Sequence, residues 1–395
     1  MKRTVLFILV ALGLLLGACA SPTQAPATSS APSSAQPTAA PKASGEPIKF
    51  ALIGPLTGVN AVLGEWQRKG WTLVFDGVNA AGGVKGRPIA YQLEDDEADP
   101  TKAVNLAQKV ITQDKVLAAH ACPNSTPTLA VVPIFAQYKV PHFTAALNVD
   151  ITNKGSKYVF RTAPAGPAYE NTLVDFLVAQ KGLKKMAIIS DTSAFGKGEG
   201  DYQEAALARN GGLKATIRET YGIEDKDFTG QLTKIMQTNP EVLLIAGSEV
   251  AGGLIAKQAR QFGFKGTIAG GTAIGTPKFA ETAGDAAEDV IFASPYITPD
   301  VSDVAKTWAA KYKARWGEEL ESHGAQAIDG ANLFVMALNN AYPNITSESI
   351  AVELHKIKGY QGIQGVFNVD EKGEMLTKTT IGIIKGGKLT PYTGK

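Results

Sequence analysis

From residue 48 onward, short apolar runs alternate with longer segments in which apolar residues recur at helical spacing. The runs at 48–54 (IKFALIG) and 242–246 (VLLIA) are apolar almost throughout, which is typical of strands buried on both faces of a parallel sheet. Strands separated by helices predict an α/β fold. Because these runs are more numerous than the strands of an ordinary single sheet, we predict two doubly wound, Rossmann-like lobes.

The predicted elements form two series along the chain. Strands are predicted first at 48–54, 89–93, 116–119, 141–144 and 158–162, and then, from about Ala168 onward, at 185–190, 216–221, 242–246, 267–270, 290–293, 365–368 and 379–385. Helices are predicted at 64–80, after Asp99-Pro100, and at 129–138, 199–209, 229–237, 253–262, 278–283, 303–316, 326–341 and 347–358. Ligands of such sheets bind beyond the carboxyl ends of the strands, so two facing lobes would enclose one cleft.

The N-terminus has the features of a secretion signal. Lys2 and Arg3 precede an apolar stretch at 5–17, which is too short to span a bilayer comfortably but suits a signal peptide. The stretch ends in Leu16-Gly17-Ala18-Cys19, which resembles a bacterial lipobox. This predicts a signal peptide at 1–18 and a lipidated Cys19. The alternative is a chance cysteine near an ordinary cleavage site.

A low-complexity segment follows the predicted lipidation site. Of the 28 residues at 20–47, 23 are Ala, Pro, Ser or Thr. Such a segment cannot bury enough apolar surface to offset the entropy lost on ordering. We therefore predict a disordered tether at 19–47, and a folded part that works just outside a membrane.

Charge and motif content exclude several functions. Lys+Arg 39 against Asp+Glu 37 gives a net charge of +2, which provides no basic surface for nucleic acid. No nucleophile elbow or phosphate-binding loop occurs, and the histidines lack metal-ligand spacing: His120, His142, His323 and His355. We expect no catalytic residues, no metal and no cofactor.

Several motifs resemble one transport family. They are Ile53-Gly54-Pro55-Leu56-Thr57-Gly58, Gly64, Gly70, the run 79–89 (NAAGGVKGRPI), Glu94-Asp95-Asp96, Asp99-Pro100, Phe160-Arg161-Thr162, Phe195-Gly196, Lys226-Asp227-Phe228 and the run 283–288 (AGDAAE). In this order they resemble the branched-chain amino-acid (Leu/Ile/Val-type) periplasmic binding proteins of ABC importers. The resemblance extends over nearly all of 48–395.

This resemblance implies a type I periplasmic binding protein fold, in which three chain crossings form the hinge. The crossings are expected near 162–167, 293–297 and 366–370. The N-terminal lobe would then comprise 48–164 and 297–365, and the C-terminal lobe 165–296 and 366–395. Proteins of this kind close on a ligand by hinge motion.

The resemblance also implies which residues of the first lobe bind the ligand. In the family, a loop after the third strand offers a serine and backbone N–H groups to the ligand carboxylate. Here Pro123 stands at the serine position, and Asn124 or Ser125 would substitute, with plain helix capping as the alternative. The next loop, Ala145-Ala146-Leu147, lacks the family's threonine but keeps its backbone N–H groups. Leu63 and Trp66 are also expected to line the cleft.

In the second lobe, Phe195 occupies the family's aromatic position, with core packing as the alternative. Amino-acid binders hold the ligand ammonium with a tyrosine near Ser248 and a glutamate near Thr272, and neither is present. Glu249 could take over, or could be a solvated acid at a helix start. The family's half-cystine near Ala98 is also missing, which leaves Cys122 as a free, buried thiol.

These departures predict an altered, more apolar pocket on a retained scaffold. We expect an extracytoplasmic, lipid-anchored protein, at a periplasmic or cell-surface membrane, that captures a small organic solute for an ABC importer. The solute would be an amino acid or an apolar or aromatic carboxylate. The alternatives are a branched-chain amino-acid binder that uses Glu249, a sensor that signals to a membrane partner, and an extracytoplasmic hydrolase. The absence of a nucleophile–base pair in the sequence argues against the hydrolase.

The expected partners follow from this function. They are the small-molecule ligand, the permease and ATPase subunits of the importer, and a membrane reached through the lipid anchor. Nucleic acid is not expected as a partner, and the protein is expected to be a monomer.

Overall fold

The computed structural model describes residues 43–154, 156–375 and 378–394. The predicted signal peptide, Cys19 and most of the predicted tether lie outside these residues. Within them, no helix is both long and apolar enough to cross a membrane.

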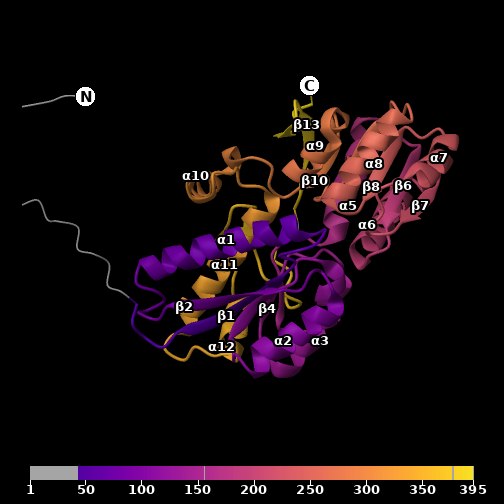
Figure 1. Ribbon diagram of the computed structural model, residues 1–395. Coiled ribbons are helices and arrows are strands. Elements are labelled where there is room, and N and C mark those ends of the chain that lie inside the picture. Colours follow the sequence, from indigo (N-terminus) through magenta and orange to yellow (C-terminus); the bar gives the residue numbers. More distant parts are fainter. Residues whose placement is uncertain (1–42, 155, 376–377, 395) are drawn as a thin grey trace, which may run out of the picture. The chain divides into compact units, whose positions relative to one another are not determined.

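The first lobe is built on a five-stranded parallel sheet with the strand order β2-β1-β3-β4-β5. The strands are β1 (Ile48–Gly54), β2 (Ile89–Asp95), β3 (Ala118–Ala121), β4 (His142–Thr144) and β5 (Val159–Arg161). The helices that belong to this lobe are α1 (Ala61–Ala80), α2 (Pro100–Thr112), α3 (Ser125–Tyr138), α4 (Asp150–Asn153), α10 (Asp303–Trp316), α11 (Ser322–Ala341) and α12 (Ser347–His355). Figure 1 shows α1 and α11 side by side.

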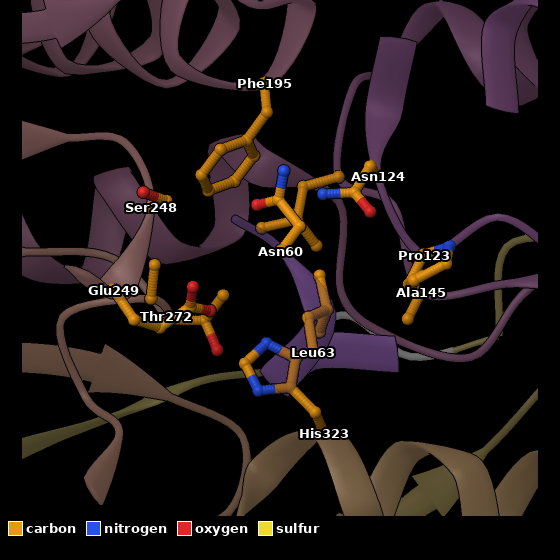
Figure 2. A pocket seen from close by; sticks show the side chains of 12 residues that line it. Asn60, Leu63, Pro123, Asn124, Ala145, Phe195, Ser248, Glu249, Thr272 and His323 are labelled. Carbon is orange, nitrogen blue, oxygen red and sulfur yellow. The ribbon is translucent and has the colours of Figure 1, made fainter. Parts of the chain in front are cut away.

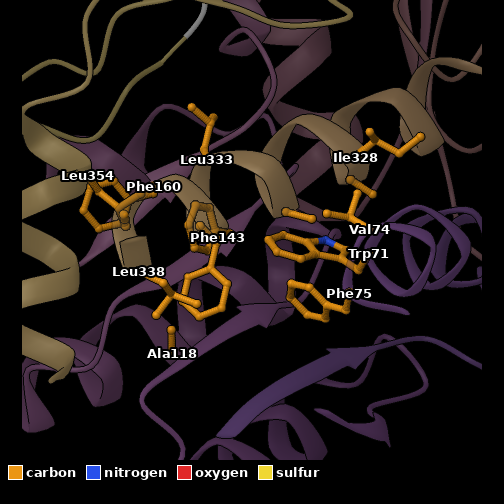
Figure 3. Close-up of a cluster of buried hydrophobic side chains, with 14 of the residues drawn as sticks. Trp71, Val74, Phe75, Ala118, Phe143, Phe160, Ile328, Leu333, Leu338 and Leu354 are labelled. Atoms are coloured by element: carbon orange, nitrogen blue, oxygen red, sulfur yellow. The ribbon is translucent and has the colours of Figure 1, made fainter. Parts of the chain in front are cut away.

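Helices cover both faces of this sheet. Successive residues of a strand point to opposite sides, so β1 packs against helices on each face. On one face, Phe50 packs with Trp71 of α1 and Phe334 of α11 in a large aromatic cluster. Figure 3 shows part of this cluster. On the other face, Ala51 and Ile53 pack against α2 and α3. This explains why β1 is apolar at nearly every position.

The second lobe is built on a seven-stranded sheet with the order β14-β13-β10-β9-β8-β6-β7. Its strands are β6 (Met186–Asp191), β7 (Arg218–Tyr221), β8 (Val242–Ala246), β9 (Thr267–Gly270), β10 (Ile291–Ser294), β13 (Thr380–Lys385) and β14 (Lys388–Pro391). Its helices are α5 (Gly166–Asp175), which continues into a π-helical turn at Phe176–Gln180, α6 (Ala194–Arg209), α7 (Thr229–Gln237), α8 (Glu249–Gln261) and α9 (Pro277–Ala283). Short 3-10 turns lie at Gly284–Ala287 and Pro299–Val301.

The two sheets share one strand order. The parallel strands of the second sheet run β7-β6-β8-β9-β10, which matches β2-β1-β3-β4-β5 of the first. In each sheet the order therefore reverses between the first and third strands of the series. The prediction of two doubly wound lobes is confirmed, and the rule for such sheets points to β1/β3 and β6/β8 as binding edges.

The last part of the chain differs from the prediction. The strands β13 and β14 pair antiparallel, and β14 was not predicted. The predicted strand at 365–368 is β12 (Val366–Phe367), which pairs with the unpredicted β11 (Tyr360–Gln361) in a separate ribbon. Phe367, Val369 and Met375 are buried in the core of the first lobe, so a lobe boundary after residue 365 falls too early.

Candidate functional site

A cavity lies where the carboxyl ends of strands from both sheets meet. Apart from the start of α11, which carries His323, each lining segment follows a strand: β1, β3 and β4 in the first lobe, and β6, β8 and β9 in the second. The residues that line it are Asn60, Leu63, Pro123, Asn124, Ala145, Leu147, Phe195, Ser248, Glu249, Thr272, Ala273 and His323 (Figure 2). The position agrees with the β1/β3 and β6/β8 edges.

The first-lobe end of the cavity is the start of α3. Asn124 is the N-cap residue of this helix, and its Oδ1 is buried with no hydrogen-bond partner within the described ranges. The first turn of a helix leaves backbone N–H groups without intrahelical acceptors and carries a partial positive charge. The hydroxyls of Thr128 and Thr144 donate to the Cys122 carbonyl, at 2.6 and 2.8 Å, and so fix the loop before the helix. This end can therefore bind an anion.

The loop after β4 contributes Ala145 and Leu147 to the cavity, but not Ala146. The Ala146 N–H donates to Thr144 Oγ1 at 3.1 Å, and its carbonyl accepts from Arg161. The expectation that Ala146 offers a free N–H to a ligand is therefore wrong, because the loop itself uses that donor.

Arg161 is fully buried and holds this loop in place. Its guanidinium donates to the Asn148 carbonyl at 2.9 Å and to Thr152 Oγ1 at 3.2 Å, and it pairs with Glu374 at 3.1 Å. Burial lowers the pKa of Arg161, although Glu374 opposes that shift. Sequence analysis placed Arg161 in a family motif without a role, and the structure makes it the anchor of the β4 loop.

The second-lobe end of the cavity is acidic. Glu249 begins α8 and is only 4% exposed, so it is not a solvated acid at a helix start. Burial raises the pKa of Glu249, and the facing His323 opposes this shift. Thr272 is 3% exposed, and its Oγ1 has no partner in the described part of the chain. A cationic group of a ligand would meet Glu249 here.

His323 is a lining residue that sequence analysis missed, together with Asn60 and Ala273. It lies in the first turn of α11, and its Nδ1 contacts Glu321 Oε2 at 2.9 Å. Its ring is stacked on Trp66, with centroids 5.5 Å apart and planes inclined by 5°. Burial disfavours the charged ring, but the Glu321 carboxylate raises the pKa of His323 overall. The sequence signal for this histidine is Glu321, an acid two positions before it.

Three predicted residues lie outside the cavity wall: Ala146, whose contacts are given above, Trp66 and Ser125. Trp66 lies behind His323, as its stacking partner. Ser125 lines a larger outer groove next to the cavity, and its hydroxyl accepts from the Asn148 N–H at 3.3 Å. The remaining predicted residues line the cavity itself.

A second group of buried acids lies behind the β9 loop. One carboxylate oxygen each of Glu199 and Glu170 lies 2.4 and 2.8 Å from the point where a Cβ on Gly271 would stand. Burial raises the pKa of both carboxyls, and the charge of Glu170 raises the pKa of Glu199 further. In the described part of the chain, no group of three or more His, Cys, Asp or Glu residues could hold a metal ion.

The chain matches known proteins over most of its length. A family described as "Periplasmic binding protein" matches residues 47–388. The Leu/Ile/Val-binding protein homolog 3 of Brucella melitensis is 25% identical, over 83% of this chain and 88% of that protein. The leucine-, isoleucine-, valine-, threonine-, and alanine-binding protein of Pseudomonas aeruginosa is 29% identical, over 63% of this chain and 67% of that protein.

Solved structures show the same fold. The leucine-binding protein LivK of Thermotoga maritima superposes with a TM-score of 0.82 and 28% identity, over 88% of this chain and 98% of that chain. The substrate-binding protein LivJ of Streptococcus pneumoniae, in complex with isoleucine, superposes with a TM-score of 0.80 and 26% identity, over 87% of this chain and 98% of that chain. These relatives are solute-binding proteins and not enzymes, and the chain belongs with them to the periplasmic binding protein family.

Proposed function

We propose that the chain captures an α-amino acid in the cavity between its lobes and releases it unchanged to a membrane importer. The carboxylate of the solute would bind at the start of α3, beside Asn124. The ammonium would bind Glu249 at the opposite end. The observation that carries this proposal is the placement of Glu249, a carboxyl group that is 4% exposed and forms part of the cavity wall.

The physical argument is charge compensation. A buried carboxylate is costly unless a cation accompanies it, and a ligand ammonium supplies that cation as the cleft closes. At the other end, the helix start stabilises a carboxylate. The two ends therefore match the two charges of an amino acid. Support also comes from relatives whose names include leucine, isoleucine and valine.

Titration calorimetry would test this pairing. Wild-type protein and Glu249→Gln are titrated with a panel of amino acids. For each amino acid that binds, both proteins are then titrated with the matching carboxylic acid that lacks the amino group. We expect the substitution to weaken amino-acid binding about 100-fold, because a charged hydrogen bond is replaced by a neutral one. Glu281→Gln, a surface glutamate whose side chain is 71% exposed, serves as the matched control. Amino-acid binding that survives Glu249→Gln would contradict the proposal.

A second candidate solute is an apolar or aromatic carboxylate. Leu63, Pro123, Leu147 and Phe195 give the cavity an apolar lining, which favours such a molecule. In that case benzoate or a short fatty acid would bind more tightly than any amino acid, and binding would not depend on Glu249. The same titrations therefore distinguish the two candidates.

We further propose that the protein is lipidated at Cys19 and is attached through this lipid and the tether to the outer side of a cell membrane. It would act as a monomer and deliver its solute to the permease and ATPase subunits of an ABC importer. The lipobox-like sequence at 16–19 supports the anchor. Mass spectrometry of the mature N-terminus would detect the lipid, and Cys19→Ser should release the protein from membranes. Measuring solute uptake in cells that lack the protein would distinguish import from sensing. Deletion of an importer component should reduce uptake, whereas deletion of a sensor should leave uptake unchanged.

A further inference from the structure

Glu170 and Glu199 form a buried acid pair that lies directly behind the cavity wall. Glu170 comes from α5 and Glu199 from α6, and their exposed fractions are 0% and 1%. One carboxylate oxygen of each lies against Gly271, at 2.8 and 2.4 Å from the point where a Cβ would stand. Thr272 and Ala273, the next two residues of the β9 loop, line the cavity. A movement of the pair is therefore passed to the cavity wall through one residue.

Most oxygens of this pair are unpartnered within the described ranges, namely both oxygens of Glu170 and Oε1 of Glu199. Burial raises the pKa of both carboxyls, and the charge of Glu170 raises the pKa of Glu199 further. Two adjacent carboxyls in a site that excludes water cannot both ionise at low cost, so they retain a proton. We therefore expect the pair to hold a proton at neutral pH.

The groups that face the pair do not take the place of this proton. Two further acids, Asp191 and Glu249, add negative charge near Glu199, and two phenols also face it, those of Tyr169 and Tyr221. Two arginines lie nearby, and both are paired elsewhere: Arg161 with Glu374, and Arg218 with Asp201 and Glu204. In the described part of the chain, a retained proton is therefore what neutralises the pair.

The cost of losing this proton depends on the position of the lobes. Thr272 is 3% exposed, in a cavity that it shares with Leu63 and His323 of the first lobe. Separation of the lobes would admit water to the β9 loop, and water lowers the cost of a second negative charge behind it. The form with the lobes together therefore holds the proton more strongly. By linkage, a rise in pH favours the open form and lowers the affinity for a solute.

We propose that Glu170 and Glu199 are positioning residues, which keep the β9 loop in place for solute binding by retaining a proton, so that the protein releases its solute more readily as the pH rises. The proposal rests on the proposed function only in placing the solute in this cavity, whichever of its groups meets each wall. Its sign distinguishes the pair from Glu249. Loss of a proton from Glu249 would strengthen the binding of an ammonium group, whereas loss of the proton from the pair weakens the binding of any solute.

Titration calorimetry between pH 6.5 and 8.5 tests this proposal. The probe is whichever of leucine, valine, alanine, threonine and benzoate binds the wild-type protein most tightly at pH 6.5. We expect its affinity to fall about 10-fold over this range, within the limit of tenfold per pH unit that one proton sets. The fall should disappear in Glu170→Gln and in Glu199→Gln, because a neutral amide keeps the shape of the protonated acid. The surface variant Glu281→Gln is the matched control and should keep the wild-type profile.

Hydrogen exchange gives a second readout that needs no solute. Peptides that cover residues 267–276 should exchange faster in wild type than in Glu199→Gln at pH 8.5, and at equal rates at pH 6.5. If one variant does not fold, the other still decides, because each removes one charge of the same pair. Parallel pH profiles of affinity in wild type and variants, or equal exchange at pH 8.5, would overturn this inference and leave the proposed function intact. Amino-acid binding that ignores Glu249→Gln would instead overturn the proposed ammonium site, while the pH profile would still decide this inference.

Discussion

The backbone N–H of Ala194 donates a hydrogen bond to Thr126 Oγ1 over 3.1 Å. Ala194 begins α6 in the second lobe, and Thr126 lies in the first turn of α3 in the first lobe. Two further bonds join α6 to the loop after β4, from Asn148 Nδ2 to the Ala194 carbonyl at 3.1 Å and from the Val149 N–H to the Tyr202 hydroxyl at 3.0 Å. Direct hydrogen bonds therefore join the two lobes beside the cavity.

Removing these contacts should favour the open form. We expect Thr126→Val and Tyr202→Phe each to weaken solute binding about fivefold, since one hydrogen bond contributes about 1 kcal/mol to closure. Small-angle scattering should show a more open protein at subsaturating solute. Thr233→Val, on the exposed side of α7, is the control because its hydroxyl bonds only within that helix. Unchanged affinity in both variants would show that the solute alone determines closure.

Two glycines of α1 should respond in opposite ways to alanine. A Cβ on Gly64 would lie 1.8 Å from the Pro55 carbonyl oxygen, whereas a Cβ on Gly77 meets nothing within 4 Å. Gly64→Ala should therefore lower the free energy of unfolding by about 2–4 kcal/mol and displace the loop that carries Asn60. Gly77→Ala should raise it by about 0.5–1 kcal/mol, as expected for an open helical position. Urea unfolding measures both values, and equal effects would contradict the packing described.

Loss of the Arg161 guanidinium should affect stability and binding together. Arg161→Met would leave the partly buried Glu374 unpaired and the Ala146 and Asn148 carbonyls without their donor. We expect the free energy of unfolding to fall by about 3–5 kcal/mol, and solute affinity to fall because the β4 loop lines the cavity. Arg209→Met, which breaks an exposed ion pair with Asp175, should cost less than about 1 kcal/mol. A similar cost at both sites would rule out the anchoring role.

The buried pair Glu170 and Glu199 should make stability depend on pH. Burial raises the pKa of both carboxyls in the folded state above the ordinary value of 4.5. The folded protein then retains protons that the unfolded chain has released, so stability falls as pH rises above about 5. Each pKa unit of the shift corresponds to about 1.4 kcal/mol.

Glu170→Gln removes one of these titrating groups while keeping its shape. We expect this variant to be more stable than wild type at pH 8.5 and to show a flatter dependence of unfolding free energy on pH between 5.5 and 8.5. Urea unfolding at several pH values measures this, with Glu281→Gln as the surface control. A parallel pH dependence in wild type and Glu170→Gln would mean that the pair does not hold an extra proton.

Much of the fold was predictable because strands buried on both faces are apolar at every position. The strand at 242–246 was predicted at its observed bounds for this reason. Helix starts were predicted less well. The helix α6 begins at Ala194, whereas the predicted start was residue 199. The prediction was late because glycines at 196, 198 and 200 interrupt the apolar periodicity in the first turns of the helix. The strand β14 is half-exposed and mixed in character, although the Gly386-Gly387 pair before it was a hairpin signal.

The candidate site was predictable only where the family motif assigns a loop. Resemblance placed Asn124, Phe195 and Glu249 near the cleft, and the structure puts all three in the cavity wall. It could not place His323, because the side chains around that ring come from α1, α8 and α11, which are far apart in the sequence. Nor could it show that Thr144 takes the Ala146 N–H, since this depends on the folded shape of one loop.

The shared strand order of the two sheets has a consequence for how such a protein diversifies. The start of α3 belongs to the first lobe, whereas Glu249 and Thr272 belong to the second, so a change confined to the second lobe leaves the start of α3 untouched. New solute preferences can thus arise by altering the starts of α8 and of the loop after β9, while the carboxylate site proposed at the start of α3 stays unaltered.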